Sequence, residues 1–456
     1  MDTKTNDVII IGAGLTGLTL AYYLKKANKK FLLLEEQKRT GGVINTLSED
    51  NFTFETGPNT GVLSSPELAL LFEDLHGKCT LETANSKSKK RYVWKKGKWN
   101  ALPSGLISAI KTPLFSIYDK FRILGEPFRK AGTNSNETIS ELVVRRLGKS
   151  YLDYAVDPFI SGIYAGDPDK LITRFALPKL YALEKNYMSF IRGAIKKKGE
   201  PKSLFQKKAT GEVFSVKGGL KNLIIALDNE IGADKIRTSC KEIQVKPFED
   251  IYHVSYINSY GEKVELHTSK VVTTVGGYAL HQMLSFIPGN ILKPLSELVY
   301  AGVVQVVAGY KLWNGSKLDA FGGLMPSKEK HGILGILFPS AIFTDRAPAN
   351  GALLSIFLGG VKNPGLINKS DNEIKSLVYD EIMETMGVSE PSDLFRIFRY
   401  PYAIPQYDIT SVERLASIDK IQNTYPGLIL AGNIRDGIGM PDRVKQACQL
   451  SELLIH

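Results

Sequence analysis

Three glycines near the start of the chain have the spacing of a phosphate-binding turn. The residues Gly12, Ala13, Gly14, Leu15, Thr16 and Gly17 follow an apolar run and open a segment with apolar residues at helical spacing. In such a turn the first glycine permits a tight bend and the second lets the backbone approach a pyrophosphate. The third lets the helix and strand pack closely. The sequence therefore predicts a dinucleotide site at residues 12–17.

Two acidic residues, Glu35 and Glu36, close the next apolar run. A carboxylate at this point hydrogen-bonds ribose hydroxyls and repels a 2′-phosphate, which favours FAD or NAD over NADP. Arg39 follows and can neutralise pyrophosphate charge, while the glycines at 41 and 42 let the backbone run close to a flavin. The continuation of this pattern at Gly57, Pro58 and Asn59 favours FAD over NAD.

The elements that must position these residues are a strand at 7–11, a helix at 15–29 and a strand at 31–34. Together they form a βαβ unit, whose crossover we expect to be right-handed. Near the other end, residues 427–432 again resemble a strand that enters a glycine turn. The fold class expected is α/β, with an FAD-binding Rossmann-like domain of the two-dinucleotide-binding-domain type built from both chain ends.

The rest of the chain predicts two further domains. We assign residues 1–85, 205–270 and 410–456 to the FAD-binding domain, and residues 86–204 to an inserted helical, basic domain. Residues 271–409, with strand-like runs and one long helical stretch, are expected to form a mixed-sheet substrate-binding domain.

Charge is unevenly distributed over the 456 residues. The chain has a net charge of +11, but the segment 86–208 alone holds 26 Lys/Arg and 10 Asp/Glu, a net charge of +16. Such a segment is typical of a surface that meets an anionic partner, and it also fits a solvated basic face. No apolar run is long enough to span a membrane and no signal-peptide layout is present, so we expect a cytoplasmic protein. The three cysteines and six histidines stand singly, which argues against a metal site.

Several motifs carry a resemblance to a known family. Besides the turn and Glu35, they comprise residues 55–59, 90–94, 100–105, 157–168, 216–220, 322–326 and 404–407. Together they resemble the oxygen-dependent protoporphyrinogen oxidases of the flavin monoamine oxidase superfamily, over essentially the whole chain. The resemblance implies oxidation of a porphyrinogen ring in haem synthesis, in three two-electron steps, with hydride transfer to flavin and reoxidation by oxygen or another acceptor. Such chemistry needs positioning more than acid–base groups, and no acid or base catalyst is assigned.

The resemblance also implies roles for individual residues. For the substrate, Arg91 is expected to pair with a propionate and Asn59 to lie near the ring, with the backbone carbonyl of Gly162 beside it and Phe321 and Leu324 as apolar neighbours. Without the family match, a surface charge would be the simpler interpretation of Arg91. The FAD contacts expected beyond the glycine turn are Glu35, Glu36, Arg39, Gly42, Val43, Gly57, Pro58, Asn59, Thr60, Cys240, Gly432, Ile438, Gly439 and Met440. Because no cysteine matches a covalent-flavin position, FAD is expected to bind non-covalently.

Alternatives remain open at this level. Close relatives act on coproporphyrinogen III, which has four propionates, and the lysines do not reveal which of them face the pocket. A flavin amine oxidase or a carotenoid desaturase is a further hypothesis, less favoured because neither the aromatic cage beside the flavin nor the catalytic lysine of amine oxidases can be placed in the sequence. A nucleic-acid partner is not expected, since no recognised module is present. Peripheral contact with an anionic membrane, at the inner face of the cytoplasmic membrane, and a homodimer are compatible with the sequence.

Overall fold

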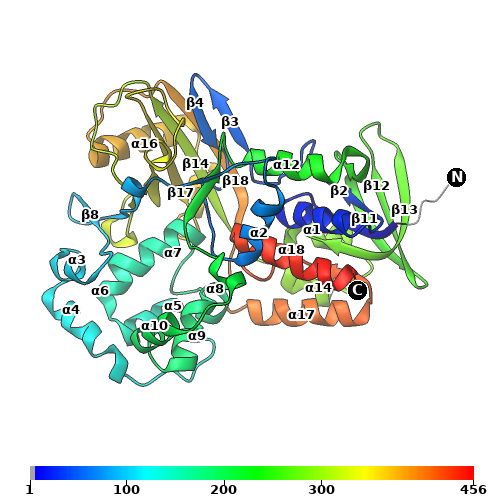
Figure 1. Cartoon of the computed structure of the whole chain (residues 1–456), viewed down its shortest axis with the longest axis horizontal. Helices are drawn as coiled ribbons and strands as arrows, with labels where there is room; N and C mark the ends of the chain where they lie inside the picture. Colours follow the sequence, from blue (N-terminus) through cyan, green and yellow to red (C-terminus); the bar gives the residue numbers. More distant parts are fainter. Residues whose placement is uncertain (1–5, 456) are drawn as a thin grey trace.

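The computed structural model describes residues 6–455 and contains two large sheets joined to a group of short helices (Figure 1). Residues 1–5 and 456, which fall in ranges assigned to the FAD-binding domain, lie outside the described residues. The first sheet has the strand order β10-β2-β1-β13-β12-β11, and β19 also pairs with β13. Its strands are β1 (Asn6–Ile11), β2 (Phe31–Leu34), β10 (Ile236–Arg237), β11 (Lys241–Phe248), β12 (Ile251–Ile257), β13 (Lys263–Thr273) and β19 (Leu428–Leu430).

Helices cover both faces of this sheet, which explains why β1 is apolar at successive positions. Val8 and Ile10 point to one face, and Ile9 and Ile11 point to the other. The helices on the Val8 face are α1 (Leu15–Lys26), α2 (Pro66–Asp74), α12 (Lys221–Ile231) and α18 (Met440–Ile455). Those on the opposite face are α13 (Gly277–Met283), α14 (Gly289–Ser296) and α17 (Ser411–Thr424).

Strand β13 brings distant parts of the chain together. Its first half pairs with β12 and its last residues pair in parallel with β19, while β1 runs parallel to it on the other side. The carboxyl ends of β1, β2, β13 and β19 therefore meet at one edge of the sheet. In open parallel sheets this edge is where nucleotide ligands bind.

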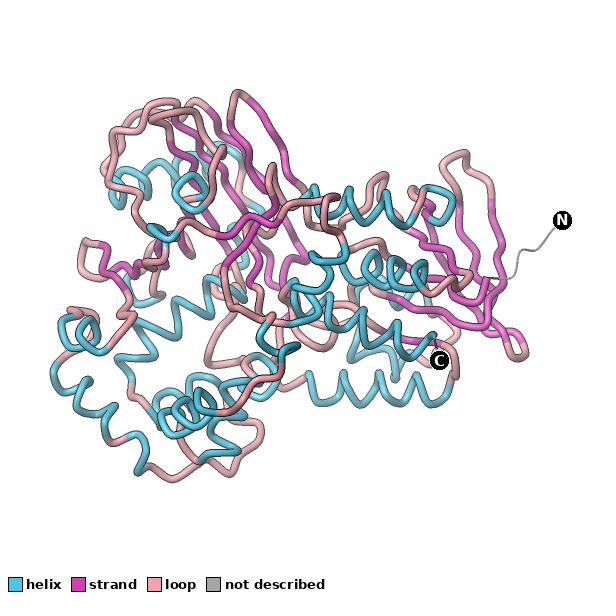
Figure 2. The backbone as a smooth tube through the Cα atoms, in the orientation of Figure 1, coloured by secondary structure: helices cyan, strands magenta, loops and turns pink. Residues whose placement is uncertain are grey.

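The second sheet has the order β18-β14-β17-β16-β15-β7-β8. Helix α16 (Asp371–Met386) covers one face of it, and in Figure 2 its strands form a layer separate from the first sheet. The strands are β7 (Tyr92–Trp94), β8 (Trp99–Ala101), β14 (Tyr300–Tyr310), β15 (Gly322–Leu324), β16 (Gly335–Leu337), β17 (Ala352–Gly359) and β18 (Leu394–Pro405), and the short helix α15 (Pro339–Ile342) lies beside β17. Two small sheets connect the large ones: β3 (Thr46–Glu49) with β4 (Phe52–Glu55), and β9 (Val213–Val216) between β5 (Gly61–Val62) and β6 (Leu81–Thr83).

The inserted segment is helical but is broken into short pieces. Its helices are α3 (Leu106–Lys111), α4 (Ile117–Leu124), α5 (Ile139–Arg146), α6 (Lys149–Tyr151), α7 (Asp157–Tyr164), α8 (Thr173–Ala176), α9 (Pro178–Tyr187), α10 (Phe190–Gly199) and α11 (Leu204–Lys207). Helices α9 and α10 follow each other closely but are separate, because Met188 adopts a left-handed conformation and Ser189 caps a new helix. A π-helical stretch, Leu152–Val156, joins α6 to α7, so one helix runs from 149 to 164.

The structure differs from the expected domain ranges in two places. Helices α13 and α14, assigned to the substrate-binding range, pack on the first sheet through Leu280, Leu292 and Leu295. Strands β7 and β8, assigned to the helical range, belong to the second sheet. The domain boundaries had been placed from the composition of the sequence. In both cases the segment instead packs against or pairs with a sheet on the other side of the expected boundary.

Candidate active site

The glycine turn connects β1 to α1 and leaves open space at one position. Gly12 has φ +103°, and a Cβ there would lie 2.7 Å from Thr274 Oγ1. A Cβ on Gly17 would lie 2.0 Å from the Gly12 carbonyl oxygen, so the helix and turn are in backbone contact. At Gly14, by contrast, a Cβ would meet no atom within 4 Å. The turn therefore has tightly packed glycines on both sides of an open backbone surface at the N-terminus of α1.

Glu35 lies at this surface, at the carboxyl end of β2. Its buried carboxylate accepts a hydrogen bond from the Ala13 amide at 2.7 Å and another from the Gln37 amide at 2.8 Å. The neighbouring Glu36 is exposed and lies 3.8 Å from the Lys241 ammonium. Cys240 is adjacent to Glu35, because its amide donates a hydrogen bond to the Glu35 carbonyl oxygen. Burial raises the pKa of the Cys240 thiol to about 11. The thiol therefore stays protonated at neutral pH.

The segment after Arg39 lies directly on the glycine turn. The Arg39 guanidinium donates to the carbonyl oxygens of Thr40 at 3.0 Å, Gly42 at 2.6 Å and Ile44 at 3.1 Å. A Cβ on Gly42 would lie 3.4 Å from the Gly14 Cα. These hydrogen bonds show that Arg39 fixes the loop 40–44. Its expected contact with a pyrophosphate is a separate role and stays a prediction.

Residues 57–60, which are expected to contact FAD, pack against the loop that contains Gly42 and Val43. A Cβ on Gly57 would lie 2.0 Å from the Val43 carbonyl oxygen, while the Val43 side chain itself is exposed. Asn59 is buried, and its amide nitrogen donates to the Gly57 carbonyl oxygen at 3.0 Å. Pro58 and Thr60 on either side are half-buried.

The C-terminal contact segment is a loop between β19 and α18. Gly432 has φ +87°, and its amide donates to the side-chain oxygen of Gln446 at 2.8 Å. The Gly439 amide donates to Asp442 at 3.0 Å, which fixes the loop where Met440 begins α18. Ile438 packs against the small apolar cluster that contains Tyr164 of α7. The loop therefore connects the first sheet with the helical segment.

Four of the five substrate-binding residues expected from the sequence come together in two pairs, whereas the side chain of Asn59 donates to the Gly57 carbonyl oxygen and is in neither pair. A Cβ on Gly162, in α7, would lie 2.5 Å from Leu324 Cδ2, so the helix and β15 are in contact there. The Arg91 guanidinium lies over the Phe321 ring, 5.3 Å from its centroid. These pairs adjoin each other, because β7 and β15 are parallel neighbours and the Phe321 amide donates to the Lys90 carbonyl oxygen.

Three residues whose side-chain roles were not predicted hold these segments together. Gln406 donates to the Tyr164 carbonyl oxygen at 3.0 Å and so fixes the end of α7. The Tyr407 hydroxyl donates to the Asn433 carbonyl oxygen and accepts from the Gly437 amide, while Gln446 binds Gly432. The first two belong to the motif 404–407, which was a signal for them, whereas Gln446 stands in no quoted motif.

These segments fit an extended dinucleotide. The open backbone at Gly14, the carboxylate of Glu35 at the strand end and the glycine loops at 42 and 57 form a cradle that a side chain at Gly14 would fill. Among residues 6–455, no group of three or more His, Cys, Asp or Glu is arranged to hold a metal ion. The open backbone at Gly14 and the carboxylate of Glu35 are the groups that suit a nucleotide cofactor.

Comparison with known proteins defines the class. The flavin containing amine oxidoreductase family matches residues 15–454, and the chain belongs to this family. The solved structures it resembles include one from Exiguobacterium sp. 255-15, with a TM-score of 0.82, 23% identity and 99% of each chain covered. Reduced UDP-galactopyranose mutase is also similar, with a TM-score of 0.74, 16% identity and coverage of 98% of this chain and 95% of the other.

Relatives that match over nearly their whole length show a more specific similarity, to porphyrinogen oxidases. Mitochondrial protoporphyrinogen oxidase of Nicotiana tabacum is 32% identical over 98% of this chain and 94% of its own length. Protoporphyrinogen oxidase 2 of Arabidopsis thaliana is 30% identical, covering 98% and 93%. Coproporphyrinogen III oxidase of Bacillus subtilis is 25% identical, covering 98% and 97%. The predicted resemblance, fold class and FAD cofactor are confirmed, and the protein is an FAD-dependent oxidoreductase.

A buried carboxyl group next to the site leads to a prediction about pH. Glu55 ends β4, accepts hydrogen bonds from Thr46 and from the Leu220 amide, and has its pKa raised by burial to about 7 from the ordinary 4.5. The folded protein thus binds this proton more tightly than the unfolded chain. Its stabilising contribution is complete below pH 4.5 and is lost as the pH rises to 7, by about 3 kcal/mol.

We expect Glu55→Gln to remove this loss. Thermal unfolding followed at pH 5 and pH 8 should show the variant gaining stability over the parent protein mainly at pH 8. The exposed Glu212→Gln change is the matched control and should leave the pH dependence unaltered. Equal effects of Glu55→Gln at both pH values would show that Glu55 titrates normally.

Proposed function

We propose that the protein oxidises protoporphyrinogen IX to protoporphyrin IX in haem biosynthesis, with oxygen as the final acceptor. The observation that carries the proposal is the pairing of an apolar surface, Leu324 against Gly162, with an adjacent guanidinium on Phe321. A porphyrinogen is an apolar ring that bears carboxylates, so it requires this combination. The names of the plant relatives agree with it.

The residues of this chain would bind and orient the ring. The Arg91 guanidinium forms no ion pair within residues 6–455, so it is free to bind a propionate. Gly162 lies in the last turn of α7, and its carbonyl oxygen has no hydrogen-bond donor in the described part of the chain. It can accept from a pyrrole N–H, since the final carbonyls of a helix lack intrahelical partners. FAD, when bound, supplies the acceptor for the hydride removed in each two-electron step.

Coproporphyrinogen III is the second candidate substrate. Two bacterial relatives are coproporphyrinogen III oxidases, from Bacillus subtilis and Staphylococcus aureus, with 25% and 24% identity. Four propionates would require more cations at the site than two. Near Arg91, however, Lys90 is paired with Asp319 at 2.7 Å, and Lys362 near Gly162 is paired with Asp157 at 2.6 Å. This pairing favours the substrate with fewer carboxylates.

The test is anaerobic mixing of the purified FAD-loaded protein with each porphyrinogen, followed by admission of oxygen. Bleaching of the flavin and growth of porphyrin fluorescence with protoporphyrinogen would support the proposal. The same result with coproporphyrinogen alone would transfer it to that substrate. Flavin that bleaches with neither would contradict porphyrinogen oxidation and favour an amine oxidase or desaturase activity.

We also propose peripheral contact with an anionic membrane through the α3–α4 surface. Its exposed apolar side chains, each 64–84% exposed, are Ile107, Ile110, Ile117, Tyr118, Phe121, Leu124 and Phe128, and in Figure 1 these helices lie at one edge of the molecule. Basic residues such as Lys111 and Lys120 lie among them, as in helices that bind an interface. No helix among the described residues is long and apolar enough to cross a membrane.

The membrane proposal predicts a loss of vesicle binding in Phe121→Ser. Removing one exposed aromatic ring should weaken binding to vesicles with anionic lipid about tenfold, in a co-sedimentation assay at low salt. Leu312→Ser, which removes an apolar side chain of similar exposure from another surface, is the control and should have no effect. Parent protein that stays in the supernatant would refute the contact.

A further inference from the structure

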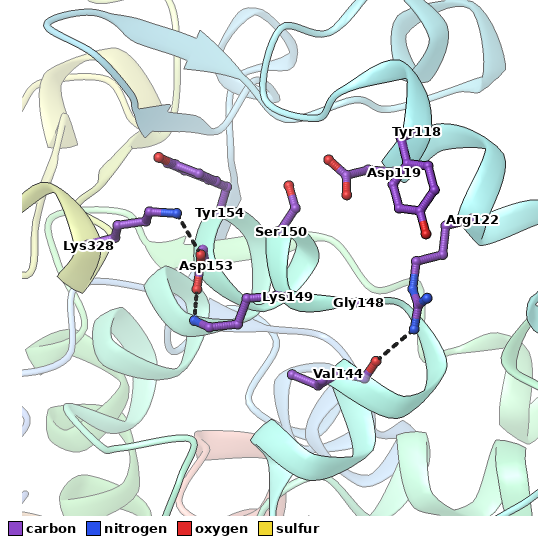
Figure 3. A pocket seen from close by; sticks show the side chains of 10 residues that line it. All are labelled: Tyr118, Asp119, Arg122, Val144, Gly148, Lys149, Ser150, Asp153, Tyr154 and Lys328. Atoms are coloured by element: carbon purple, nitrogen blue, oxygen red, sulfur yellow. Dashed lines mark hydrogen bonds and ion pairs between the residues drawn. The ribbon is translucent and has the colours of Figure 1, made fainter.

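The helix that carries Gly162 is attached to the substrate side of the second sheet by polar contacts at successive turns. Three consecutive residues after β15, Ser327–Glu329, each bind one residue of the helix. The Ser327 amide donates to Asp157 at 2.7 Å, Lys328 pairs with Asp153 at 2.9 Å, and the Tyr154 hydroxyl donates to Glu329 at 2.9 Å. Figure 3 shows the Lys328 end of this row, where Asp153 lies between Lys149 and Lys328 beside a hollow of about 400 Å³.

Lys362 joins the other end of this row to both ends of α7. Its ammonium lies 2.6 Å from Asp157 at the start of α7, 3.0 Å from the Ser327 hydroxyl and 3.7 Å from Asp167 just beyond the helix. The residue before it also contacts the helix end, because the Val361 amide donates to the Ala165 carbonyl oxygen at 2.9 Å. One cation therefore lies between two carboxylates that flank the helix of Gly162.

Burial makes this contact hard to replace by water. The side chains of Asp157 and Asp167 are 8% and 17% exposed, and that of Lys362 is 29% exposed. Without the ammonium, neither of these two largely buried carboxylates would have a cation partner among residues 6–455, which disfavours the observed packing. The Lys328 contact differs, because Asp153 would keep its second partner, Lys149.

We propose that Lys362 is a positioning residue of the reaction, which holds α7 against β15 and so sets the distance between Gly162 and Leu324 at the substrate ring. The proposal rests on the proposed function for the identity of the ring. Lys362 touches neither ring nor flavin in this role. It acts through Asp157 and Ser327, which join the helix of Gly162 to the turn that follows Leu324. A loosened helix would still leave Arg91 to bind a propionate, but the ring would no longer be held in the reactive orientation.

The test compares Lys362→Met with Lys328→Met in the FAD-loaded protein. For Lys362→Met we expect kcat for the porphyrinogen to fall about 10- to 100-fold with KM changed less than about threefold, because misplacement of a bound substrate affects the reactive geometry. Lys328→Met should change neither constant beyond about twofold, and Lys362→Arg should restore most of kcat. Parent-like kcat in Lys362→Met, or a rise in KM alone, would overturn the proposal.

A second measurement does not depend on the substrate. Hydrogen–deuterium exchange should become faster over residues 157–168 in Lys362→Met and remain unchanged there in Lys328→Met. If Lys362→Met fails to fold, Ser327→Ala removes the same link more mildly and should show the same two effects at smaller size. Faster exchange with no porphyrinogen turnover even in the parent protein would refute the proposed function but retain the structural link. Unchanged exchange in both Lys362→Met and Ser327→Ala would refute the link itself.

Discussion

Gly14→Val is expected to give a folded protein without yellow colour. In the absence of a ligand, the Cβ of valine at this position meets no atom within 4 Å, and the Gly14 backbone, with φ −72° and ψ −179°, is allowed for any residue. The side chain would instead occupy the surface on which a pyrophosphate must approach the N-terminus of α1. We expect the Kd for FAD to rise at least about 100-fold, which is about 2.7 kcal/mol of binding free energy.

Two other glycines separate loss of the cofactor from loss of the fold. Gly105 caps α3 as Gly14 caps α1, and it too has no atom within 4 Å of a Cβ, so Gly105→Val should retain full flavin. Gly17→Val places a Cβ 2.0 Å from the Gly12 carbonyl oxygen and should reduce soluble yield as well as colour. The measurement is the ratio of flavin to protein absorbance, with circular dichroism for folding. Full flavin content in Gly14→Val would show that the pyrophosphate lies elsewhere.

Arg91→Ala should raise KM for the porphyrinogen about 10- to 100-fold while kcat changes little. A charge-assisted hydrogen bond to a carboxylate contributes about 1.5–3 kcal/mol, and a propionate remote from the reacting carbon is bound equally in the ground and transition states. Loss of such uniform binding appears in KM. The guanidinium lies over the Phe321 ring, a contact that favours a planar cation. Arg91→Lys keeps the charge but not the planar group, so its KM should lie between the values of the parent protein and Arg91→Ala.

The adjacent lysine provides the control for Arg91. Lys90 carries the same charge one residue earlier, but its ammonium is paired with Asp319 at 2.7 Å. Lys90→Ala should therefore leave KM within about twofold of the parent value. Steady-state kinetics with both porphyrinogens checks the pair of variants. An unchanged KM in Arg91→Ala would remove this residue from the substrate site, and an equal rise in Lys90→Ala would indicate a general effect of surface charge.

Local patterns were sufficient for the parts of the site that follow one another along the chain. The apolar run 7–11, the glycines at 12, 14 and 17 and the acid at Glu35 predicted a βαβ unit with a dinucleotide at its edge, because strand, turn and helix signals act over a few residues. The long helical stretch predicted within residues 271–409 is α16, and its ends are local as well, because Ser370 caps its start and Gly387 ends it in a left-handed conformation. The FAD cofactor and the family followed from motifs of the same local kind.

Contacts between distant residues were decided by the tertiary structure alone. Gly162 meets Leu324, and Lys362 meets both Asp157 and Asp167, only because β15 and the loop after β17 pack against one helix. The domain limits near 92–101 and 277–298 also depended on which sheet offered cover to their apolar side chains. Local propensity determines whether a segment is helix or strand, whereas the burial of its apolar face against a remote partner determines where it lies. For this reason the FAD cofactor could be predicted from the sequence. The residues that position α7, the helix that carries Gly162, became visible only in the folded chain.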